Sequence, residues 1–492
     1  MLKEFVRPED GLDKETRKVE AKRLEKLLVS LQPALREAKL PVVVLVEGWA
    51  AAGKGSLINR LISDIDPRFS GVFSLDSGRR DADRYPFLYP FFAALPENGK
   101  MTFMDGGWME AAVQDRLRSG GSREEFRERI LSVNRFERQL RDNGYLVLKL
   151  FVHIDREEQA LRQKELLDDK DTAWRVSIYD RFQNREYGQF RKAYEEFMEA
   201  TGEIFPWHVV DGSGKNKLNY DAFRLLTELI EKGLEAGKYT GLPFEEAFPM
   251  APAPKLGEVD LSLRLEEEEY REELKALQKR LAKLHNMIYR KRIPVVIGFE
   301  GWDAAGKGGA IRRLAYPLDP RGFDTYPISS PEPHELNRHY LWRFWTRLPR
   351  TGHVAIFDRT WYGRVMVERI EGFCSEKDWQ RAFSEINEFE QDLRDWGAVV
   401  LKFWIHIDPE TQLARFNERQ NTPEKQWKIT EEDWRNREKW PLYEEAVSEM
   451  LEKTSTEAAP WHVIESDDKL YARIKVLRIV AEALEKAVKE KD

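Results

Sequence analysis

A glycine-rich segment with one lysine occurs twice in this chain of 492 residues. The second occurrence, GWDAAGKGG at residues 301–309, directly follows the apolar run PVVIGFE and precedes a segment with helical spacing. Glycines at such a turn let backbone N–H groups approach an anion closely, and the start of a helix adds a favourable dipole. Lys307 would reach a terminal phosphate, so the spacing predicts a phosphate-binding loop of the Walker A type.

This loop departs from the usual pattern at a position that matters for metal binding. The Ser or Thr that normally follows the lysine and binds Mg²⁺ is Gly308 here and Gly55 in the first occurrence. Asp303, inside the second loop, offers a carboxylate instead, since Mg²⁺ accepts one or two carboxylates together with phosphates and water. A surface turn carrying a lysine is the alternative, but two occurrences after strand-like runs favour phosphate binding.

A second carboxylate, Asp358, ends the apolar run HVAIFD, as in a Walker B strand, where it holds Mg²⁺ directly or through water. Arg359 follows at once, and Arg364 comes shortly after it. Guanidinium groups at this edge of a sheet can stabilise the charge on a transferring phosphoryl group. For Arg364, Glu368 and Arg369, an ordinary helix with i,i+4 ion pairs explains the pattern equally well.

Cations and tryptophans are interleaved in a third segment, residues 415–440, which follows the apolar run ending in HIDP. In nucleotide kinases, a mobile helical lid at this place closes over phosphates and excludes water. The alternative is an amphipathic pair of surface helices, because glutamates neutralise many of the cations. We favour the lid, whose cations are Arg415, Arg419, Lys425, Lys428, Arg435 and Arg437.

The pattern recurs along the chain at a fixed offset. Lys54 and Lys307 lie 253 positions apart, and the same offset relates Asp105 to Asp358 and Trp174 to Trp427. The register holds over that whole stretch without an insertion, which indicates a tandem duplication.

The two copies differ where chemistry would be carried. The first copy keeps Lys54 and Asp105, but it lacks the loop carboxylate, both arginines after the strand and most lid cations. Its replacements are Ala50 for Asp303, Gly106 for Arg359, Ala111 for Arg364, Leu166 for Arg419, Phe182 for Arg435 and Asn184 for Arg437. Losing one charge-stabilising donor typically costs about 10²–10³ in rate, so we expect catalysis in the second copy. The first copy would stabilise, dimerise or hold an anionic chain, the last through Arg79, Arg80 and Arg84, although a solvated loop is the favoured interpretation of these three arginines.

The elements that must position these residues are readable in both copies. Apolar β-branched runs at residues 41–48 and 294–301 predict buried parallel strands, and further strands end at Asp105, Asp358 and the two HID triplets. Strands alternating with helical segments predict an α/β fold with parallel sheets flanked by helices. Helices are expected over residues 14–39 and 263–292, and the proline-containing stretch between the copies predicts a linker. The expected domains are 1–239 and 263–492, joined by residues 240–262.

Composition limits the remaining possibilities. The net charge is −7 and no basic stripe is evident, which argues against nucleic-acid binding. The single cysteine, Cys374, cannot form an intramolecular disulfide, and no apolar run approaches the roughly 20 residues that cross a bilayer. We therefore expect a cytoplasmic protein that does not bind a membrane.

The residues described so far resemble the polyphosphate kinase type 2 family, and within it the two-domain polyphosphate:AMP phosphotransferases. The resemblance rests on residues 301–309, 331–373 and 426–434 and covers both halves of the chain. It implies tandem P-loop domains similar to thymidylate kinase, each with a helical lid, and reversible Mg²⁺-dependent phosphoryl transfer from inorganic polyphosphate to AMP, which gives ADP. It also suggests a homodimer.

The resemblance assigns roles to named residues. Asp303, Lys307, Asp358, Arg359 and Arg364 would be catalytic, with Asp303 and Asp358 holding the metal. The phosphates and the nucleotide would be bound by Gly301, Ala304, Ala305, Gly306, Gly308, Gly309, Arg338, Glu368, Arg369, Arg419, Lys428 and Arg435. Two alternatives stay open: an ATP-dependent nucleotide or small-molecule kinase of the same fold, and a non-catalytic phosphate-binding protein.

Overall fold

A computed structural model describes residues 2–3, 5, 11–75, 84–237, 239 and 247–491, with the backbone alone at Lys425 and Lys428. Arg79 and Arg80, two of the cations suggested to hold an anionic chain, lie outside the described residues, as do 240–246 of the expected linker. The rest of that linker contains one short 3₁₀ helix, η3 (Leu256–Glu258).

The chain divides into two compact units. The first comprises Met1–Arg79, Phe87–Gly241 and Pro333–His339, and the second comprises Arg80–Pro86, Leu242–Glu332 and Tyr340–Asp492. The two short segments, 333–339 and 80–86, are related by the same offset of 253 positions as the rest of the repeat. Each unit therefore includes one segment from the other half of the sequence.

Unit 1 is built on a five-stranded parallel sheet in the order β2-β3-β1-β4-β5. Its strands are β1 (Val42–Gly48), β2 (Ser70–Ser74), β3 (Met101–Asp105), β4 (Leu146–His153) and β5 (Trp207–Asp211). Its helices are α1 (Lys14–Ser30), α2 (Gln32–Ala38), α3 (Lys54–Ile62), α4 (Tyr89–Ala93), α5 (Trp108–Arg118), α6 (Arg123–Asp142), α7 (Arg156–Asp168), α8 (Ile178–Arg185), α9 (Tyr187–Ala200), α10 (Lys215–Ala236) and α13 (Pro333–Leu336), with η2 (Ala173–Arg175) as a 3₁₀ turn.

Unit 2 repeats this sheet with the strand order β7-β8-β6-β9-β10. Its strands are β6 (Val295–Gly301), β7 (Phe323–Pro327), β8 (Val354–Asp358), β9 (Val399–His406) and β10 (Trp461–Glu465). Its helices are α11 (Glu267–Lys291), α12 (Lys307–Ala315), α14 (Trp342–Trp345), α15 (Val367–Ile370), α16 (Glu376–Asp395), α17 (Pro409–Asn421), α18 (Glu431–Glu438), α19 (Trp440–Thr454) and α20 (Lys469–Glu490), with η4 (Trp361–Arg364) and η5 (Pro423–Lys428).

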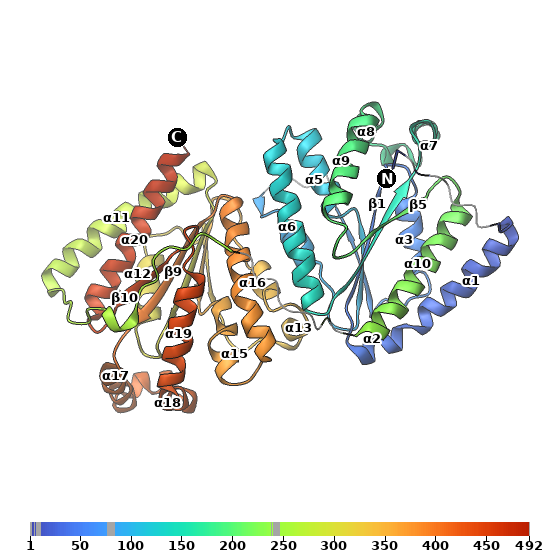
Figure 1. Ribbon diagram of the computed structural model, residues 1–492. Helices are drawn as coiled ribbons and strands as arrows, with labels where there is room; N and C mark the ends of the chain where they lie inside the picture. The colour runs from blue at the N-terminus through green and yellow to red at the C-terminus, as the bar shows by residue number, and fades with distance from the viewer. Residues whose placement is uncertain are drawn as a thin grey trace. The chain divides into compact units, whose positions relative to one another are not determined.

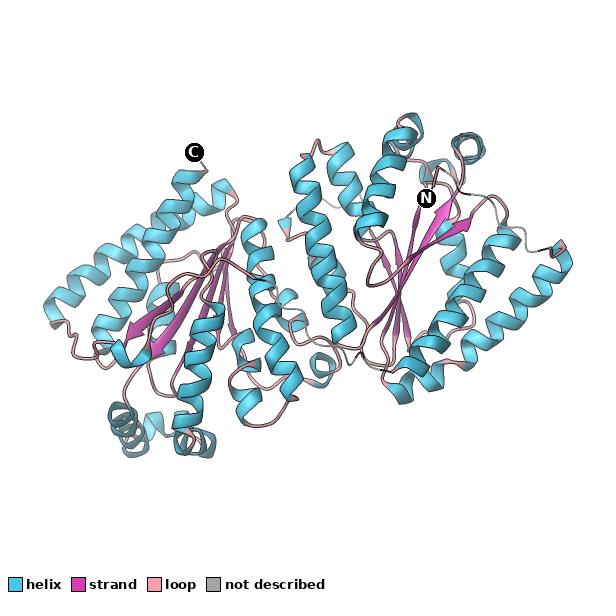
Figure 2. Cartoon of the chain, viewed as in Figure 1, coloured by secondary structure: helices cyan, strands magenta, loops and turns pink. Residues whose placement is uncertain are grey.

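Helices cover both faces of each sheet (Figures 1 and 2). In unit 1, α3 and α10 pack on one face, with α1 against α10, and α5 and α6 pack on the other. In unit 2, α12 and α20 correspond to the first pair, and α16 packs on β9 from the other face. Every residue of β1 and β9 is buried, as expected for strands covered on both sides. The α/β fold with tandem parallel sheets is therefore confirmed.

Two of the predicted helices differ from a single regular helix. The stretch 14–39 forms α1 and α2, because Pro33 has no N–H to continue the hydrogen-bond ladder and starts a new helix instead.

The segment after β8 also differs between the copies. In unit 1 it is one helix, α5, whereas in unit 2 it is divided into η4 and α15 around Val365 and Met366.

The equivalent lysines Lys149 and Lys402 lie inside the two cores and do not face a site. Lys402 Nζ is 2.7 Å from Glu390 Oε2, and Lys149 Nζ is 2.8 Å from Glu137 Oε2, with all four side chains at most 1 % exposed. Each lysine also donates to a backbone carbonyl, so the buried charges are paired and hydrogen-bonded, as stability requires.

Candidate active site

The carboxyl edge of the second sheet brings two neighbouring strand ends together. β6 leads into the glycine-rich loop and β8 ends at Asp358, which pairs in register with Phe299 of β6. The loop then enters α12 at Lys307, with Gly306 in the left-handed region at φ 116°. Ala304 (φ 61°) and Arg359 (φ 66°) adopt the same region without being glycines. Such strain persists where the surroundings impose it, often at functional sites.

The glycine-rich loop is held in place by side chains of α17 and of the segment after β10. Arg415 donates to the carbonyls of Ala304 (3.1 Å) and Ala305 (3.0 Å), and Ser466 Oγ donates to the same Ala305 carbonyl at 2.6 Å. Gln412 Nε2 donates to the carbonyl of Asp303 at 3.1 Å. Arg415, expected among the lid cations, is buried and fixes the loop backbone instead. Its counterpart Arg162 binds the same carbonyls in unit 1.

Trp302 fixes the loop on its other side. Its indole stacks on Trp440 at the start of α19, with ring centroids 3.7 Å apart and planes at 12°. Trp302 Nε1 donates to His406 Nδ1 (3.1 Å), and Trp404 Nε1 donates to the same atom (3.3 Å). Burial lowers the pKa of His406 to about 4, so the ring is neutral at physiological pH and Nδ1 is free to accept both bonds.

Three charged side chains line the space next to the loop: Asp303, Lys307 and Arg359. Arg359 Nη2 lies 3.7 Å from Asp303 Oδ1, and Asn436 of α18 donates from Nδ2 to Asp303 Oδ2 at 3.0 Å. Lys307 Nζ donates to the carbonyls of Gly301 (2.5 Å) and Trp302 (3.3 Å). In the part of the chain that the structure describes, Lys307 forms no ion pair, so its charge is available to an anion.

The three side chains line two cavities, which we call the outer and inner chambers. The outer chamber, about 520 Å³, is walled by the loop, the strand ends and the lid segment. Its lining comprises Trp302, Asp303, Ala304, Ala305, Gly306, Lys307, Gly308, Gly309, Pro327, Ile328, Asp358, Arg359, Arg419, Trp427 and Asp433. It thus brings together the loop, both aspartates, Arg359 and one lid cation. Gly301, also expected at the site, lines the inner chamber.

The inner chamber, about 90 Å³, lies behind the same charges. Besides Asp303, Lys307 and Arg359, it is lined by Glu300, Gly301, Trp302, Gly363, Met366, Val367, Trp404, Gln412, Glu432, Asn436, Trp440 and Tyr443. Glu300 accepts from Thr360 N (2.6 Å) and Thr360 Oγ1 (2.8 Å), and burial raises the pKa of its carboxyl. The volume exceeds that of one water molecule several times, so the chamber has room for a small polar group.

Both predicted metal ligands, Asp303 and Asp358, face the outer chamber. Within the described residues, no cluster of three or more His, Cys, Asp or Glu side chains forms a complete protein cage for a metal. Mg²⁺ does not need such a cage, because it commonly takes one or two carboxylates and completes its shell with water and substrate phosphates. The donor set therefore fits Mg²⁺ bound together with a phosphate ligand.

Several residues expected at the site have other partners. Arg364 Nη1 pairs with Glu368 Oε2 at 3.1 Å, the i,i+4 arrangement of the alternative interpretation, and its guanidinium covers the Tyr340 ring. Arg369 pairs with Glu449, and Arg435 approaches Glu371 at 3.8 Å. Arg338 lies in unit 1, where Nε donates to the Leu95 carbonyl at 2.9 Å. These residues line neither chamber. The side chain of Lys428 is outside the described part.

The structure also adds residues that the sequence did not single out. Asn436 holds the loop carboxylate, Glu300 anchors the segment after β8, and Trp440 supports Trp302. Their only signal in the sequence is position, since Glu300 directly precedes the loop and the other two fall in the lid segment. Two tryptophans near these elements, Trp345 and Trp361, are 1 % exposed and belong to the core.

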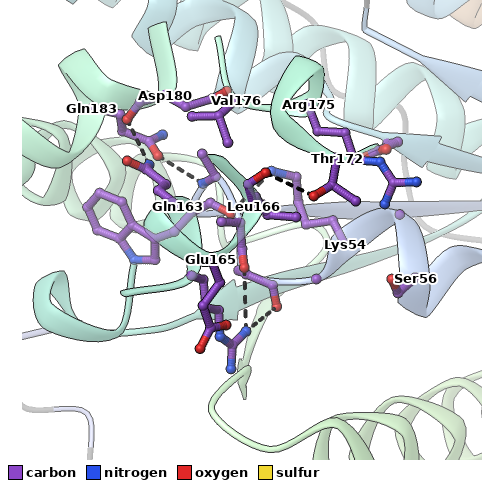
Figure 3. A pocket seen from close by; sticks show the side chains of 18 of the residues that line it. Lys54, Ser56, Gln163, Glu165, Leu166, Thr172, Arg175, Val176, Asp180 and Gln183 are labelled. Atoms are coloured by element: carbon purple, nitrogen blue, oxygen red, sulfur yellow. Dashed lines mark hydrogen bonds between the residues drawn. The ribbon is translucent and has the colours of Figure 1, made fainter. Parts of the chain in front are cut away.

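The equivalent cavity of unit 1 is larger, about 1070 Å³, and differs in charge (Figure 3). Its lining includes Lys54 of the loop and Asp105 at the end of β3. Leu166, Thr172 and Arg175 line it from the side of α7 and η2. Lys54 Nζ lies 3.8 Å from Glu110 Oε2. Ala50 replaces the loop carboxylate, and its N–H donates to Gln183 Oε1 at 2.9 Å. The loop scaffold is thus retained without the charged set of unit 2.

A strand-loop-helix phosphate site at the carboxyl edge of a parallel sheet, facing a helical lid segment, defines a P-loop phosphotransferase fold. Comparison with known proteins gives a closer assignment. The family model of polyphosphate kinase 2 (PPK2) matches residues 11–236 and again residues 264–492. The chain therefore belongs to the polyphosphate kinase 2 family and carries two copies of the family's domain.

Two relatives match over almost the whole chain. A polyphosphate:AMP phosphotransferase of Pseudomonas syringae pv. tomato is 41% identical over 97% of both chains. A polyphosphate:AMP phosphotransferase of Pseudomonas aeruginosa is 39% identical over 98% of both chains. A crystal structure assigned to polyphosphate kinase 2 from Pseudomonas aeruginosa PA01 superposes with a TM-score of 0.82 at 37% identity and covers 98% of each chain. No helix among the described residues is long and apolar enough to cross a membrane.

Proposed function

We propose that this chain is a polyphosphate:AMP phosphotransferase whose active site is the pair of chambers in unit 2. The observation that carries the proposal is that Asp303, Lys307 and Arg359 line both chambers at once. A phosphoryl group held at these three side chains can be approached from two sides, as in-line transfer between two phosphates requires. The names of the two bacterial relatives, which match nearly the whole chain, supply the substrates of the proposal.

In this proposal, the loop N–H groups and Lys307 hold the oxygens of the phosphoryl group. Arg359 stabilises the charge that develops on those oxygens in a loose transition state. Asp303 and Asp358 would hold Mg²⁺, which when bound supplies positive charge to the phosphate oxygens. No general base is required, because the attacking phosphate of AMP is already largely ionised near neutral pH.

Asn436 and Arg419 connect the lid segment to this chemistry. Asn436 fixes one oxygen of Asp303 and leaves the other toward Arg359, while Arg419 faces the outer chamber from α17. Closing the segment over the substrates would exclude water and so protect the phosphoanhydride from hydrolysis. One anhydride is broken and one is formed, so the reaction is expected to be reversible. The cytoplasmic location and the homodimer stay predictions.

The substrate assignment is tested by a donor and acceptor screen with the purified chain and Mg²⁺. Polyphosphate and ATP are compared as donors, and AMP, ADP, GMP and GDP as acceptors. We expect ADP to form from polyphosphate and AMP. Turnover with ATP in place of polyphosphate, or binding without any turnover, would contradict the proposal and favour one of the two alternatives.

The assignment of catalysis to unit 2 is tested by one pair of matched substitutions. Lys307→Ala should lower kcat by about 10²–10³, because it removes a charge that faces both chambers. Lys54→Ala, the equivalent change in unit 1, should leave kcat within about twofold of the unmodified chain, since Lys54 already faces the Glu110 carboxylate. Equal losses in the two variants would mean that both units take part in catalysis.

A further inference from the structure

The two units differ at a pair of equivalent positions that follow the third strand of each unit in chain order. Unit 2 has Arg359 and Gly363 there, and unit 1 has Gly106 and Glu110. In unit 2, Arg359 and Gly363 both line the inner chamber. In unit 1, Glu110 lies on α5 and projects toward the loop lysine.

Glu110 occupies space that an anion would need in unit 1. Its Oε2 lies 3.8 Å from Lys54 Nζ, and the two side chains are only 17% and 13% exposed. Gln114 Nε2 donates to Glu110 Oε1 at 3.2 Å, whereas Oε2 has no hydrogen-bond partner among the described residues. The unpartnered oxygen is therefore the one that faces the lysine.

Glu110 also explains why the arginine is missing from unit 1. A Cβ atom built on Gly106 would lie 3.0 Å from Glu110 Oε2 and 3.2 Å from Leu75 Cβ. Contacts of this length are tighter than side chains normally show, so a larger residue at 106 and the observed Glu110 conformation compete for the same space. The exchange of arginine for glycine and that of glycine for glutamate are thus two parts of one structural change.

The two loop lysines, Lys54 and Lys307, also differ in the negative charge that surrounds them. Burial disfavours a charged Lys54, but Glu110, Asp105, Asp180 and Glu47 outweigh this effect and raise the pKa of its ammonium group. Burial also raises the pKa of the Glu110 carboxyl, and the nearby Lys54 opposes that rise. An incoming phosphate would meet a lysine that already lies beside the Glu110 carboxylate. Lys307 in unit 2 has the Gly363 backbone in place of that glutamate, and the inner chamber opens beside it.

We propose that the residue at this position decides whether a unit accepts phosphate: Gly363 lets a phosphate group of the substrate reach Lys307, and Glu110 acts as a built-in anion that keeps phosphate away from Lys54. The inference rests on the proposed function for unit 2. For unit 1 it concerns the binding of an inorganic oligophosphate and does not depend on turnover.

The first test introduces the unit 1 residue into unit 2. Gly363→Glu should lower kcat/KM for polyphosphate and AMP by about 10² or more, because it places a carboxylate beside Lys307. Gly363→Gln adds a side chain of the same size without the charge. Its loss of kcat/KM should be at least tenfold smaller than that of Gly363→Glu. Thermal unfolding of both variants shows that they are folded. Losses within threefold of each other would overturn the proposal, since size alone would then explain them.

The second test opens the loop of unit 1 and uses binding as its readout. In a Lys307→Ala background, which removes the lysine of unit 2, calorimetric titration with inorganic tripolyphosphate measures the remaining affinity. Adding Glu110→Gln should tighten binding by about tenfold or more, since a charge facing Lys54 is removed. Glu165→Gln removes one charge from an exposed position on the same cavity and serves as the matched control.

The second test decides whether Glu110 keeps phosphate away from Lys54. Tighter binding with Glu110→Gln and a change below threefold with Glu165→Gln would support the built-in anion. No change with Glu110→Gln, or the same gain in both variants, would overturn it. If unmodified protein fails to turn over polyphosphate and AMP, the proposed function fails, but the titration still tests the role of Glu110.

Discussion

Arg359 combines an unfavourable backbone conformation with a central place among the charges of unit 2. Its φ of 66° lies in the left-handed region, which costs a residue with a side chain roughly 1–2 kcal/mol. The equivalent residue of unit 1 is Gly106, which adopts φ 77° without this cost. The chain thus keeps the same turn in both copies, and at this turn only the copy whose guanidinium faces the chambers carries the strain.

Substituting Arg359→Gly separates activity from stability. We expect kcat to fall by about 10²–10³, because a charge-stabilising donor is lost. The free energy of unfolding should stay within about 1 kcal/mol of the original value, since relief of strain offsets the greater freedom of glycine in the unfolded chain. Steady-state kinetics and urea unfolding measure the two effects. A large loss of stability would show that the arginine is mainly a structural residue.

His406 makes the loop of unit 2 sensitive to acid. Its pKa is lowered to about 4 by burial, whereas an unfolded chain binds the proton near pH 6.5. Between these values the unfolded state carries more protons, so stability should fall as the pH drops from about 6.5 to 4. His462, with its pKa also lowered to about 4, adds to the same trend.

The contribution of His406 is isolated by His406→Asn, because an amide oxygen can accept the Trp302 and Trp404 N–H groups where Nδ1 does now. We expect the variant to lose less stability than the unmodified chain between pH 6.5 and 4, as measured by urea unfolding followed by tryptophan fluorescence. Parallel losses in the two proteins would assign the acid sensitivity to other groups.

At the scale of elements, a hydrogen bond from Asn436 joins α18 to the loop carboxylate Asp303. Asn436→Ala removes the donor to Asp303 and should lower kcat/KM by about tenfold, the low end for a bond to a charged acceptor that is partly exposed. Asn436→Asp should be more damaging, since it sets a second carboxylate beside the first. Gln183→Ala, at the equivalent position of unit 1, is the control. A similar loss in that control would indicate a general effect on folding.

The same elements show how far the sequence could be interpreted. The strands and the loop were predictable because β-branched runs and a glycine-rich turn before a helix are strong local signals. The different roles of Arg415 and Arg419 were not predictable. The two arginines lie one turn apart on α17, yet one is buried against loop carbonyls and the other lines the outer chamber. Residues four apart lie on the same face of a helix, so the two roles differ because tertiary packing places different neighbours opposite each arginine, which the spacing of cations does not encode.

The division of the helix after β8 was also outside the reach of pattern analysis. Residues 108–118 and 361–370 occupy equivalent places, but only the first forms one continuous helix. In unit 1, Glu47 accepts from the N–H groups of Met109 and Glu110 and so caps α5, whereas the equivalent Glu300 binds Thr360. The same carboxylate therefore binds the start of a helix in one unit and Thr360 in the other, a difference in tertiary contact that the local sequence pattern does not show.

At the scale of the whole molecule, a chain with a net charge of −7 must bind a polyanion through a few local cations. Three cations with described side chains line the outer chamber: Lys307, Arg359 and Arg419. If each contact contributes as it does on single-stranded nucleic acids, about 0.7 per phosphate, log KM for polyphosphate should rise with log[KCl] with a slope of about 2. Initial rates at several KCl concentrations measure it, and a slope above about 4 would reveal further basic contacts.

The ring pair formed by Trp302 and Trp440 has a spectroscopic consequence. Two indoles stacked 3.7 Å apart couple their electronic transitions, whereas the equivalent pair in unit 1 joins Trp49 to a tyrosine, Tyr187. Among the described residues, ring contacts between two indoles are found in unit 2, where Trp302 contacts both Trp404 and Trp440. An indole–indole exciton couplet in the circular dichroism spectrum would therefore originate from unit 2. The chain thus carries an intrinsic, label-free optical reporter for one of its two homologous halves, which would allow the melting of that half to be followed separately in the intact protein.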